Sequence, residues 1–246
     1  MRAPQDTSTR DALRRLSACT RRRITATLVA SALLLPAIAH AQIRRPTVSA
    51  SNGWWISGGA AGVVMGDVTD GASHSTWRFG TDPRVQYRAT LEKALDDFTT
   101  FGVSAGFGTV DLILGSIGGA PNTHLPSSCT TGCAATTELW TGMAQFRSGG
   151  GTGFHTLFEA SGGATGFRNF ASKADGIAIP GIKSTFDVSG TLGAGFAYPL
   201  SRRMVLSLVQ DFGMGLHAKT DLPEGTGRSW RVRNTRAALR LKFGGR

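Results

Sequence analysis

The sequence predicts an all-β fold, an antiparallel up-and-down transmembrane β-barrel of about eight strands. Three observations predict it: an export signal at the N-terminus, apolar and polar residues that alternate with a period of two, and connections that are long and short in turn. The chain also has 33 glycines and little sustained period of 3.6 residues, so a helical domain is not expected.

Residues 1–41 have the three parts of a signal peptide. Arg21–Arg23 form a basic region, residues 24–38 are largely apolar, and Ala39-His40-Ala41 matches a small-x-small cleavage site. An apolar run of about 15 residues is too short for a membrane-spanning helix, which needs about 20. We therefore expect cleavage before Gln42.

Cleavage would leave a short periplasmic segment at 42–53, followed by the barrel at 54–246. The leader removes seven of the 27 Lys and Arg residues and two of the 16 Asp and Glu residues, which leaves 20 basic and 14 acidic residues and a net charge of +6. These charges are spread along the chain and form no basic stripe with aromatic residues. Nucleic-acid binding is therefore not expected, whereas contact with anionic lipid suits the modest positive excess.

Eight segments of the mature chain alternate between apolar and small or polar residues, as the wall of a membrane barrel should. The clearest runs from 185 to 198, with Phe, Val, Leu and Tyr on one face and Thr, Asp, Ser and Gly on the other. The first and fourth segments are less regular. The expected strands cover about residues 54–66, 84–91, 101–108, 136–147, 154–161, 185–198, 206–217 and 236–243.

The connections between these segments are long and short in turn, which is typical of a barrel with long external loops and short periplasmic turns. The aromatic residues agree, because several fall near the expected periplasmic strand ends, where an interfacial girdle belongs. The long connections are 67–83, 115–135, 165–183 and 218–229, the short ones are 95–98, 148–151 and 199–202, and the girdle residues are Phe101, Phe146, Phe154, Phe196, Tyr198 and Phe243.

Cys129 and Cys133 are the two cysteines that remain after cleavage, and they lie in the second long connection. The surrounding stretch is rich in Ser, Thr and Gly and contains no third cysteine, whereas a zinc site would need four ligands and normally a tighter spacing. Export to an oxidising compartment favours a disulfide between them in an external loop. No metal and no cofactor are expected.

Residues 54–243 resemble the small eight-stranded outer-membrane barrels typified by the transmembrane domain of outer-membrane protein A and its X-type and W-type relatives. The resemblance is architectural. The closing strand, with Leu239, Leu241 and Phe243 alternating, is similar to the C-terminal signal of such barrels. The resemblance implies that the protein lies in the bacterial outer membrane. Its implied partners are outer-membrane lipids and, during insertion, the barrel-assembly machinery.

Two patterns suggest enzyme chemistry, and neither predicts a catalytic residue here. The G-x-S-x-G match at 102–106 lies inside an alternating strand instead of the sharp strand-to-helix turn that a nucleophile needs. His155 and Glu159 share a strand face and would serve as base and acid in a lipid-modifying enzyme of the outer membrane. They are expected to point into the barrel, however, which favours an interior polar cluster.

Charged and polar side chains are expected to close the lumen. An eight-stranded barrel is just wide enough for its own side chains, and buried charges are costly unless they are paired. The function then resides in the external loops and an unidentified surface ligand, with a narrow porin-like channel, a lipid-modifying enzyme and a soluble secreted barrel as the alternatives. The expected lumen residues are His155, Glu159, Asp187, Asp211, His217, Arg236 and Arg240.

Overall fold

A computed structural model gives the fold of residues 53–119, 122–151, 153–222 and 226–244. The signal peptide expected at 1–41 lies outside these residues, as does the expected periplasmic segment apart from Gly53. The described residues contain ten strands, which in chain order are β1 (Trp54–Met65), β2 (Val68–Asp70), β3 (Ser75–Phe79), β4 (Arg84–Ala94), β5 (Thr99–Ser116), β6 (Cys133–Ser148), β7 (His155–Ser172), β8 (Thr185–Ser201), β9 (Met204–Leu216) and β10 (Ser229–Phe243).

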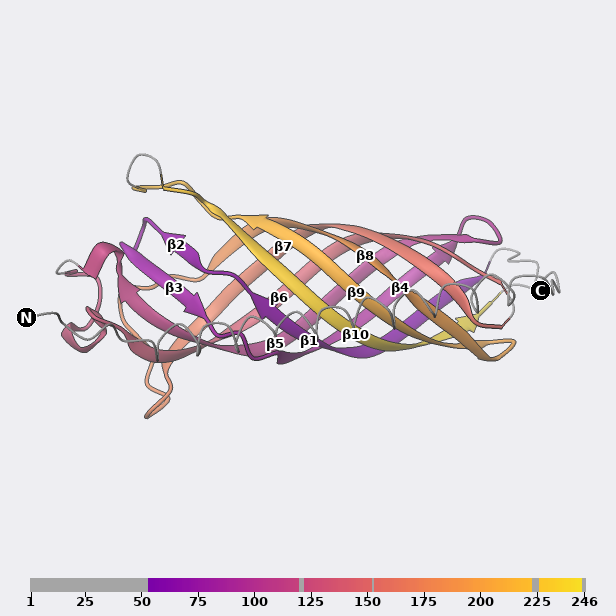
Figure 1. Ribbon diagram of the computed structural model, residues 1–246, viewed down its shortest axis with the longest axis horizontal. Helices are drawn as coiled ribbons and strands as arrows, with labels where there is room; N and C mark the ends of the chain where they lie inside the picture. Colours follow the sequence, from indigo (N-terminus) through magenta and orange to yellow (C-terminus); the bar gives the residue numbers. More distant parts are fainter. Residues whose placement is uncertain (1–52, 120–121, 152, 223–225, 245–246) are drawn as a thin grey trace, which may run out of the picture. The chain divides into compact units, whose positions relative to one another are not determined.

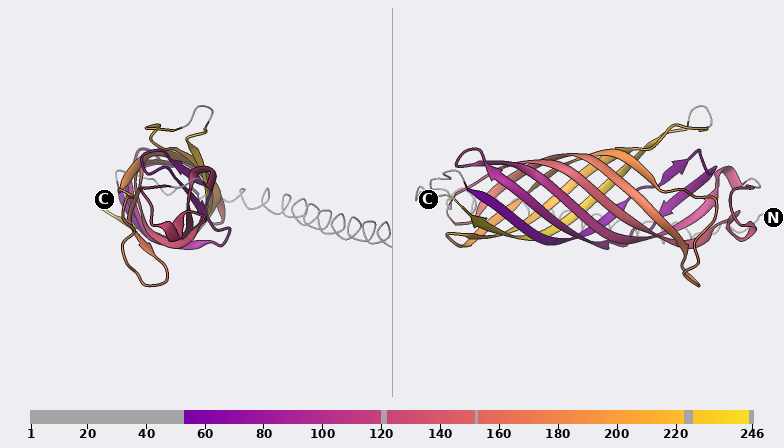
Figure 2. Two further views of the ribbon diagram at one scale, coloured as in Figure 1. Left: turned by 90° about the vertical axis from the view of Figure 1, so that its left-hand side faces the viewer. Right: turned by 180° about the vertical axis from the view of Figure 1, so that it is seen from behind.

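Eight of these strands form a closed antiparallel barrel. Each long strand pairs with its neighbour in the order β5-β4-β1-β10-β9-β8-β7-β6, and a further pairing between β5 and β6 closes the ring. The end-on view in Figure 2 shows this ring, and Figure 1 shows the strong tilt of the strands. The predicted fold, an up-and-down barrel of eight strands, is confirmed.

The two ends of the barrel differ in the length of their connections. Turns 95–98, 149–154 and 202–203 lie at one end, here called the short-turn end. The four long connections lie at the opposite end, here called the loop end, on the left in Figure 1. The long connections cover residues 66–83, 117–132, 173–184 and 217–228.

The first long connection, where the sequence predicts a loop, contains a β-hairpin. Strand β2 pairs with β3, and β3 also pairs with β5, from Ser75 opposite Ser116 to Phe79 opposite Leu112. Because β4 begins only at Arg84, β3 takes its place in the barrel wall beside the loop-end part of β5. Strands of three and five residues are too short for alternation to reveal them.

Short 3₁₀ turns occupy parts of the second long connection, η1 (Ile117–Gly119) and η2 (Ser127–Cys129). In the part of the chain that the structure describes, no helix has the length and apolar character needed to cross a membrane.

The interior of the barrel changes character along its axis. On β1, Ser57 faces inward and is buried near the short-turn end, whereas near the loop end Val63 and Met65 face inward and are buried. On β10, Trp230 is buried at the loop end while its neighbour Arg231 is exposed. The barrel is thus apolar outside and polar inside near the short turns, and the reverse near the loops. This change explains why the first strand alternates poorly in sequence.

Strand β7 extends to Ser172, beyond the loop start expected at residue 165. A β-bulge interrupts its pairing with β6, and Asn169 within it has a φ of 54°. The extra residue places Phe167 and Phe170, three positions apart, both in the buried core. A bulge of this kind breaks the period of two, which is why the alternation did not identify this part of the strand.

Candidate functional site: a lumen closed at two levels

Six charged side chains of alternating sign form a chain of ion pairs near the short-turn end, here called the lumen network. In order they are Arg240, Glu92, Arg147, Glu159, Arg236 and Asp211, three cations and three anions. The Arg240 guanidinium lies 2.5 Å from the Glu92 carboxylate, and Arg147 Nη2 lies 3.4 Å from Glu92 Oε1 and 2.8 Å from Glu159 Oε1. Arg236 joins Glu159 to Asp211.

These ion pairs cross the bore of the barrel. Glu159 is on β7 and Arg236 is on β10, with β8 and β9 between them in the wall. Glu92 on β4 likewise reaches Arg147 on β6, past β5. All six side chains are nearly or fully buried. Bonds between strands that are not adjacent must pass through the lumen, so the network obstructs it.

A fourth arginine, Arg88 on β4, approaches the same network without a carboxylate of its own. Its Nη2 donates hydrogen bonds to Ser104 Oγ at 2.8 Å and to Gln145 Oε1 at 2.9 Å. Gln145 Nε2 in turn donates to Glu159 Oε2 at 3.1 Å. Polar side chains therefore link Arg88 to the paired charges.

The structure divides the expected lumen residues into three places. Glu159, Asp211, Arg236 and Arg240 lie in the lumen network. Asp187 and His217 lie together at the loop end. His155 begins β7 at the short-turn end, where its side chain is half-buried and its Nδ1 lies 2.9 Å from the Gly153 carbonyl oxygen.

Sequence reasoning missed Glu92 and Arg147, which hold the middle of the lumen network. The alternation already contained the signal for both. Glu92 follows the outward-facing Leu91, and Arg147 follows the outward-facing Phe146. Extending the strand expected at 84–91 by one residue would have placed Glu92 on the inner face, and Arg147 is the last residue of the strand expected at 136–147.

At the loop end, the barrel interior is filled by a buried apolar cluster around Trp77 of β3. Trp77 is completely buried, and its ring centre lies 5.4 Å from that of Phe167 and 4.7 Å from that of Phe170. Trp230 packs on Phe167 from the opposite wall. The cluster also includes Val63 and other inward-facing aliphatic residues of β1, β5 and β6. The loop end is thus closed by side chains. This is a second closure of the lumen, nearer the loop end than the ion pairs are.

Beside Trp77, the His217 side chain joins the hairpin to the barrel wall. Its Nδ1 lies 2.8 Å from Asp187 Oδ1 on β8, and its Nε2 lies 3.3 Å from Asp70 Oδ1 on β2. Burial disfavours the charged ring, but the hydrogen bonds to Asp187 and Asp70 prevail and raise the pKa of His217, which lies beyond the end of β9, to about 9. For Asp70 in the hairpin, burial is likewise outweighed by His217 and Ser73, which lower the pKa of its carboxyl.

Raising the pH from 8 to 10 should therefore loosen the hairpin. The pKa of His217 is raised on folding, so its ion pairs stabilise the fold fully below its ordinary value near 6.5, and this contribution is lost as the pH rises through about 9. With a folded-state pKa of about 9, the stability lost between pH 8 and 10 should be about 1 kcal/mol. Thermal unfolding at both pH values, compared with His217→Gln, measures it. Equal pH dependence in wild type and variant would contradict this role of His217.

The predicted disulfide between Cys129 and Cys133 is present, and it fixes the end of the second long connection. Cys129 is buried in the apolar cluster around Trp77, and Cys133 packs against that cluster. The disulfide therefore ties this connection to the closed loop end of the barrel.

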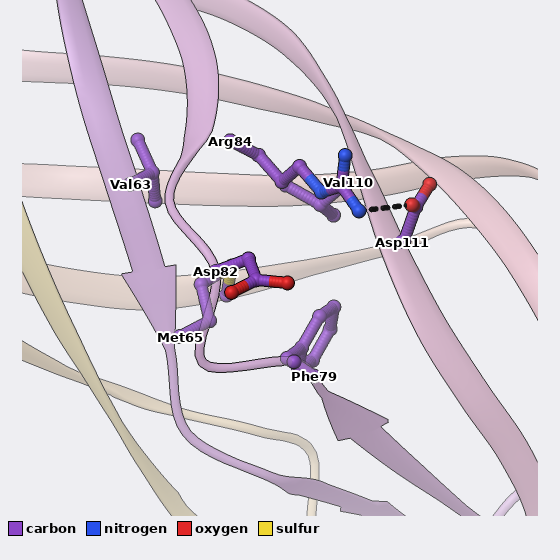
Figure 3. Close-up of a pocket in the computed structure, with 8 residues that line it drawn as sticks. Val63, Met65, Phe79, Asp82, Arg84, Val110 and Asp111 are labelled. Atoms are coloured by element: carbon purple, nitrogen blue, oxygen red, sulfur yellow. Dashed lines mark ion pairs between the residues drawn. The ribbon is translucent and has the colours of Figure 1, made fainter.

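A small recess opens in the wall between β1 and β5, where β3 ends and β4 begins (Figure 3). Its cavity volume is about 40 Å³, far below the roughly 300–1,000 Å³ of ligand pockets. Val63, Met65 and Val110 supply apolar walls, and an ion pair between Arg84 and Asp111 lies at its side. Asp111 also binds Lys173, with an Nζ to Oδ2 distance of 2.6 Å. The recess is therefore too small to be a ligand pocket.

Within the described ranges, no group of three or more His, Cys, Asp or Glu side chains is arranged to hold a metal ion. No protein-family profile and no curated protein matches the chain.

Comparison with solved structures finds small barrels over most of the chain. Neisserial surface protein A matches with a TM-score of 0.47 and 13% identity, over 77% of this chain and 97% of that one. Ail, the attachment invasion locus protein of Yersinia pestis, solved with the heparin analogue sucrose octasulfate, matches at 0.41 and 11%, over 78% and 99%. The outer membrane protein OprG from Pseudomonas aeruginosa matches at 0.40 and 13%, over 79% and 97%. The chain resembles these small outer-membrane barrels in being a closed barrel of eight strands.

Proposed function

We propose that this protein is a barrel of the bacterial outer membrane whose lumen is closed and whose four long connections act at the cell surface. The observation that carries the proposal is the double closure of the bore, by the lumen network near the short turns and by the apolar cluster at the loop end. With its interior filled, the barrel offers the loops and the outer wall as its contact surfaces.

The outer wall supports insertion in a membrane. On β10, the nine residues from Thr235 to Phe243 carry no outward-facing charge, and a transmembrane strand needs about 9–11 residues. Towards the loop end, the first outward-facing charges on the outer surface of the barrel are Asp111 on β5, Glu138 on β6, Arg168 on β7 and Arg233 on β10. They mark one boundary of an apolar band.

Aromatic residues lie on the outer surface at positions that suit membrane interfaces. Near the short turns, Phe154 stacks on Phe196 with ring centres 5.0 Å apart. Towards the loop end, Trp140 packs against Phe107, and its indole N–H donates to Glu138 Oε2 at 3.1 Å. A ring with one apolar and one polar contact is typical of a membrane boundary.

The proposed orientation places the short turns in the periplasm and the long connections, with the disulfide, outside the cell. Barrels of this class combine short periplasmic turns with longer external loops. In this orientation the exposed Arg231 and Arg233 lie just beyond the apolar band on its extracellular side, where anionic lipid headgroups would contact them. The exposed Leu239, Leu241 and Phe243 of the last strand would be presented to the barrel-assembly machinery.

We propose a structural or surface-interaction role and no enzymatic one. His155 and Glu159, the acid and base pair that a lipid-modifying enzyme would need, have different partners: His155 contacts the Gly153 carbonyl, whereas Glu159 is bound by Arg147 and Arg236. Both carboxylate oxygens of Glu159 are thus engaged by the guanidinium groups of Arg147 and Arg236 and form no pair with His155.

Cell fractionation with electrophoresis of unheated and boiled samples tests this proposal. The protein should collect in the outer-membrane fraction, and the unheated form should migrate differently from the boiled form, because the closed strand network resists detergent until it is heated. Recovery from the soluble periplasm, with the same mobility before and after boiling, would contradict it.

A further inference from the structure

The rings of two histidines from different long connections are stacked at the loop end. His74 is in the turn between β2 and β3, and His124 is in the second long connection. Their ring centres are 5.6 Å apart with an angle of 26° between the ring planes. Both side chains are exposed. Neither belongs to the lumen network or to the buried apolar cluster.

The backbones that carry these two histidines are held together by Asn122. Its Nδ2 donates to the carbonyl oxygens of Ser73 at 2.9 Å and of His74 at 2.8 Å, while its Oδ1 accepts a bond from the His124 N–H at 2.8 Å. The Ile117 N–H also donates to the His74 carbonyl. One side chain thus fixes the spacing between the two histidines before any ligand binds.

We propose that His74 and His124 form a binding site for a divalent transition-metal ion of the zinc, nickel or copper class. Imidazole nitrogen is a preferred ligand of these ions. Since a zinc–nitrogen bond is about 2.0–2.1 Å, two imidazoles on one tetrahedral ion have ring centres about 5 Å apart. The observed separation is close to this value. The rings are stacked without an ion, so binding requires these exposed side chains to turn about their side-chain bonds until a nitrogen of each points at the ion.

Water would complete the coordination, because the two imidazoles are the only protein ligands in this arrangement among the described side chains. Catalytic zinc sites likewise keep positions open for water. The bound ion would cross-link the first and second long connections on the outer side of the apolar cluster. This inference goes beyond the proposed function, since it assigns a ligand to the loops whether or not they contact another molecule.

The experiment is a calorimetric titration of the mature full-length protein, folded in detergent, free of lipopolysaccharide and without a histidine tag. Zinc chloride and nickel chloride are the probes. We expect saturable binding of a single ion per chain, which is lost in both His74→Ala and His124→Ala. His155→Ala is the matched control, because it removes another partly exposed histidine at the opposite end of the barrel and should bind as the wild type does.

Folding of every variant is checked by its shift in mobility on boiling, which separates loss of the site from loss of the barrel. Because both histidines are exposed and outside the barrel strands, both variants should keep this shift. Asn122→Ala should weaken binding without abolishing it, since the ligands remain but their spacing is no longer fixed. Absence of saturable binding in the wild type, or equal binding in folded His74→Ala, would overturn the proposal.

Discussion

Replacing Arg236 with alanine is expected to lower the free energy of unfolding of the barrel by about 3–5 kcal/mol. The Arg236 guanidinium pairs with Glu159 and Asp211, and all three side chains are almost fully buried. Removal of the cation leaves the Asp211 carboxylate in the bore without its ion pair and deprives Glu159 of one of its two guanidinium partners. Urea unfolding of the protein in lipid vesicles measures the change.

Arg233→Ala is the matched control, because Arg233 lies on the same strand and faces outward. Its effect should stay within about 0.5 kcal/mol. Adding Asp211→Asn to Arg236→Ala should recover part of the loss, because the uncompensated charge is then absent. Equal effects of Arg236→Ala and Arg233→Ala would contradict the lumen network.

Replacing Trp77 with alanine is expected to cost about 3–5 kcal/mol, the usual range for emptying a buried tryptophan site. Trp77 is completely buried and contacts Phe167, Phe170 and His217 through its ring. A cavity at this position would release the hairpin from the interior. Hydrogen exchange at the β3 amides that pair with β5 should therefore become faster.

Arg78→Ala is the control for Trp77→Ala, because Arg78 is the next residue of β3 and is exposed. It should leave the exchange rates of β3 close to those of the wild type. Trp77→Phe should give a smaller loss than Trp77→Ala, since most of the volume is kept while the indole hydrogen bond to Ser75 is removed. Unchanged exchange in Trp77→Ala would show that the apolar cluster does not hold the hairpin.

The strands were predictable wherever one face meets a single environment along its whole length. The segment expected at 185–198 is β8, Thr185–Ser201, because its outer face stays apolar and its inner face small or polar throughout. The number of strands followed from such segments and from the alternation of connections. The disulfide was predictable from two neighbouring cysteines in an exported chain.

The loop end could not be predicted in the same way, because apolar residues face the interior of the barrel there and polar residues face outward. Trp77 and Trp230 face inward where the membrane pattern places polar residues. The partners in the lumen network were also beyond the sequence. Glu92 meets Arg147 across β5, and such a contact depends on the tilt and stagger of the closed barrel as much as on the spacing of residues. The same holds for Asp70, which reaches His217 only because the hairpin folds into the loop end.

Conductance of the purified protein in planar lipid bilayers tests the closed lumen most directly. Ion pairs that cross the bore and an apolar cluster at the loop end leave no continuous polar path, so the wild type should insert with little or no steady conductance. Reproducible single-channel steps from the wild type, unchanged by Arg236→Ala or Arg240→Ala, would contradict the closed lumen and identify the barrel as a narrow channel.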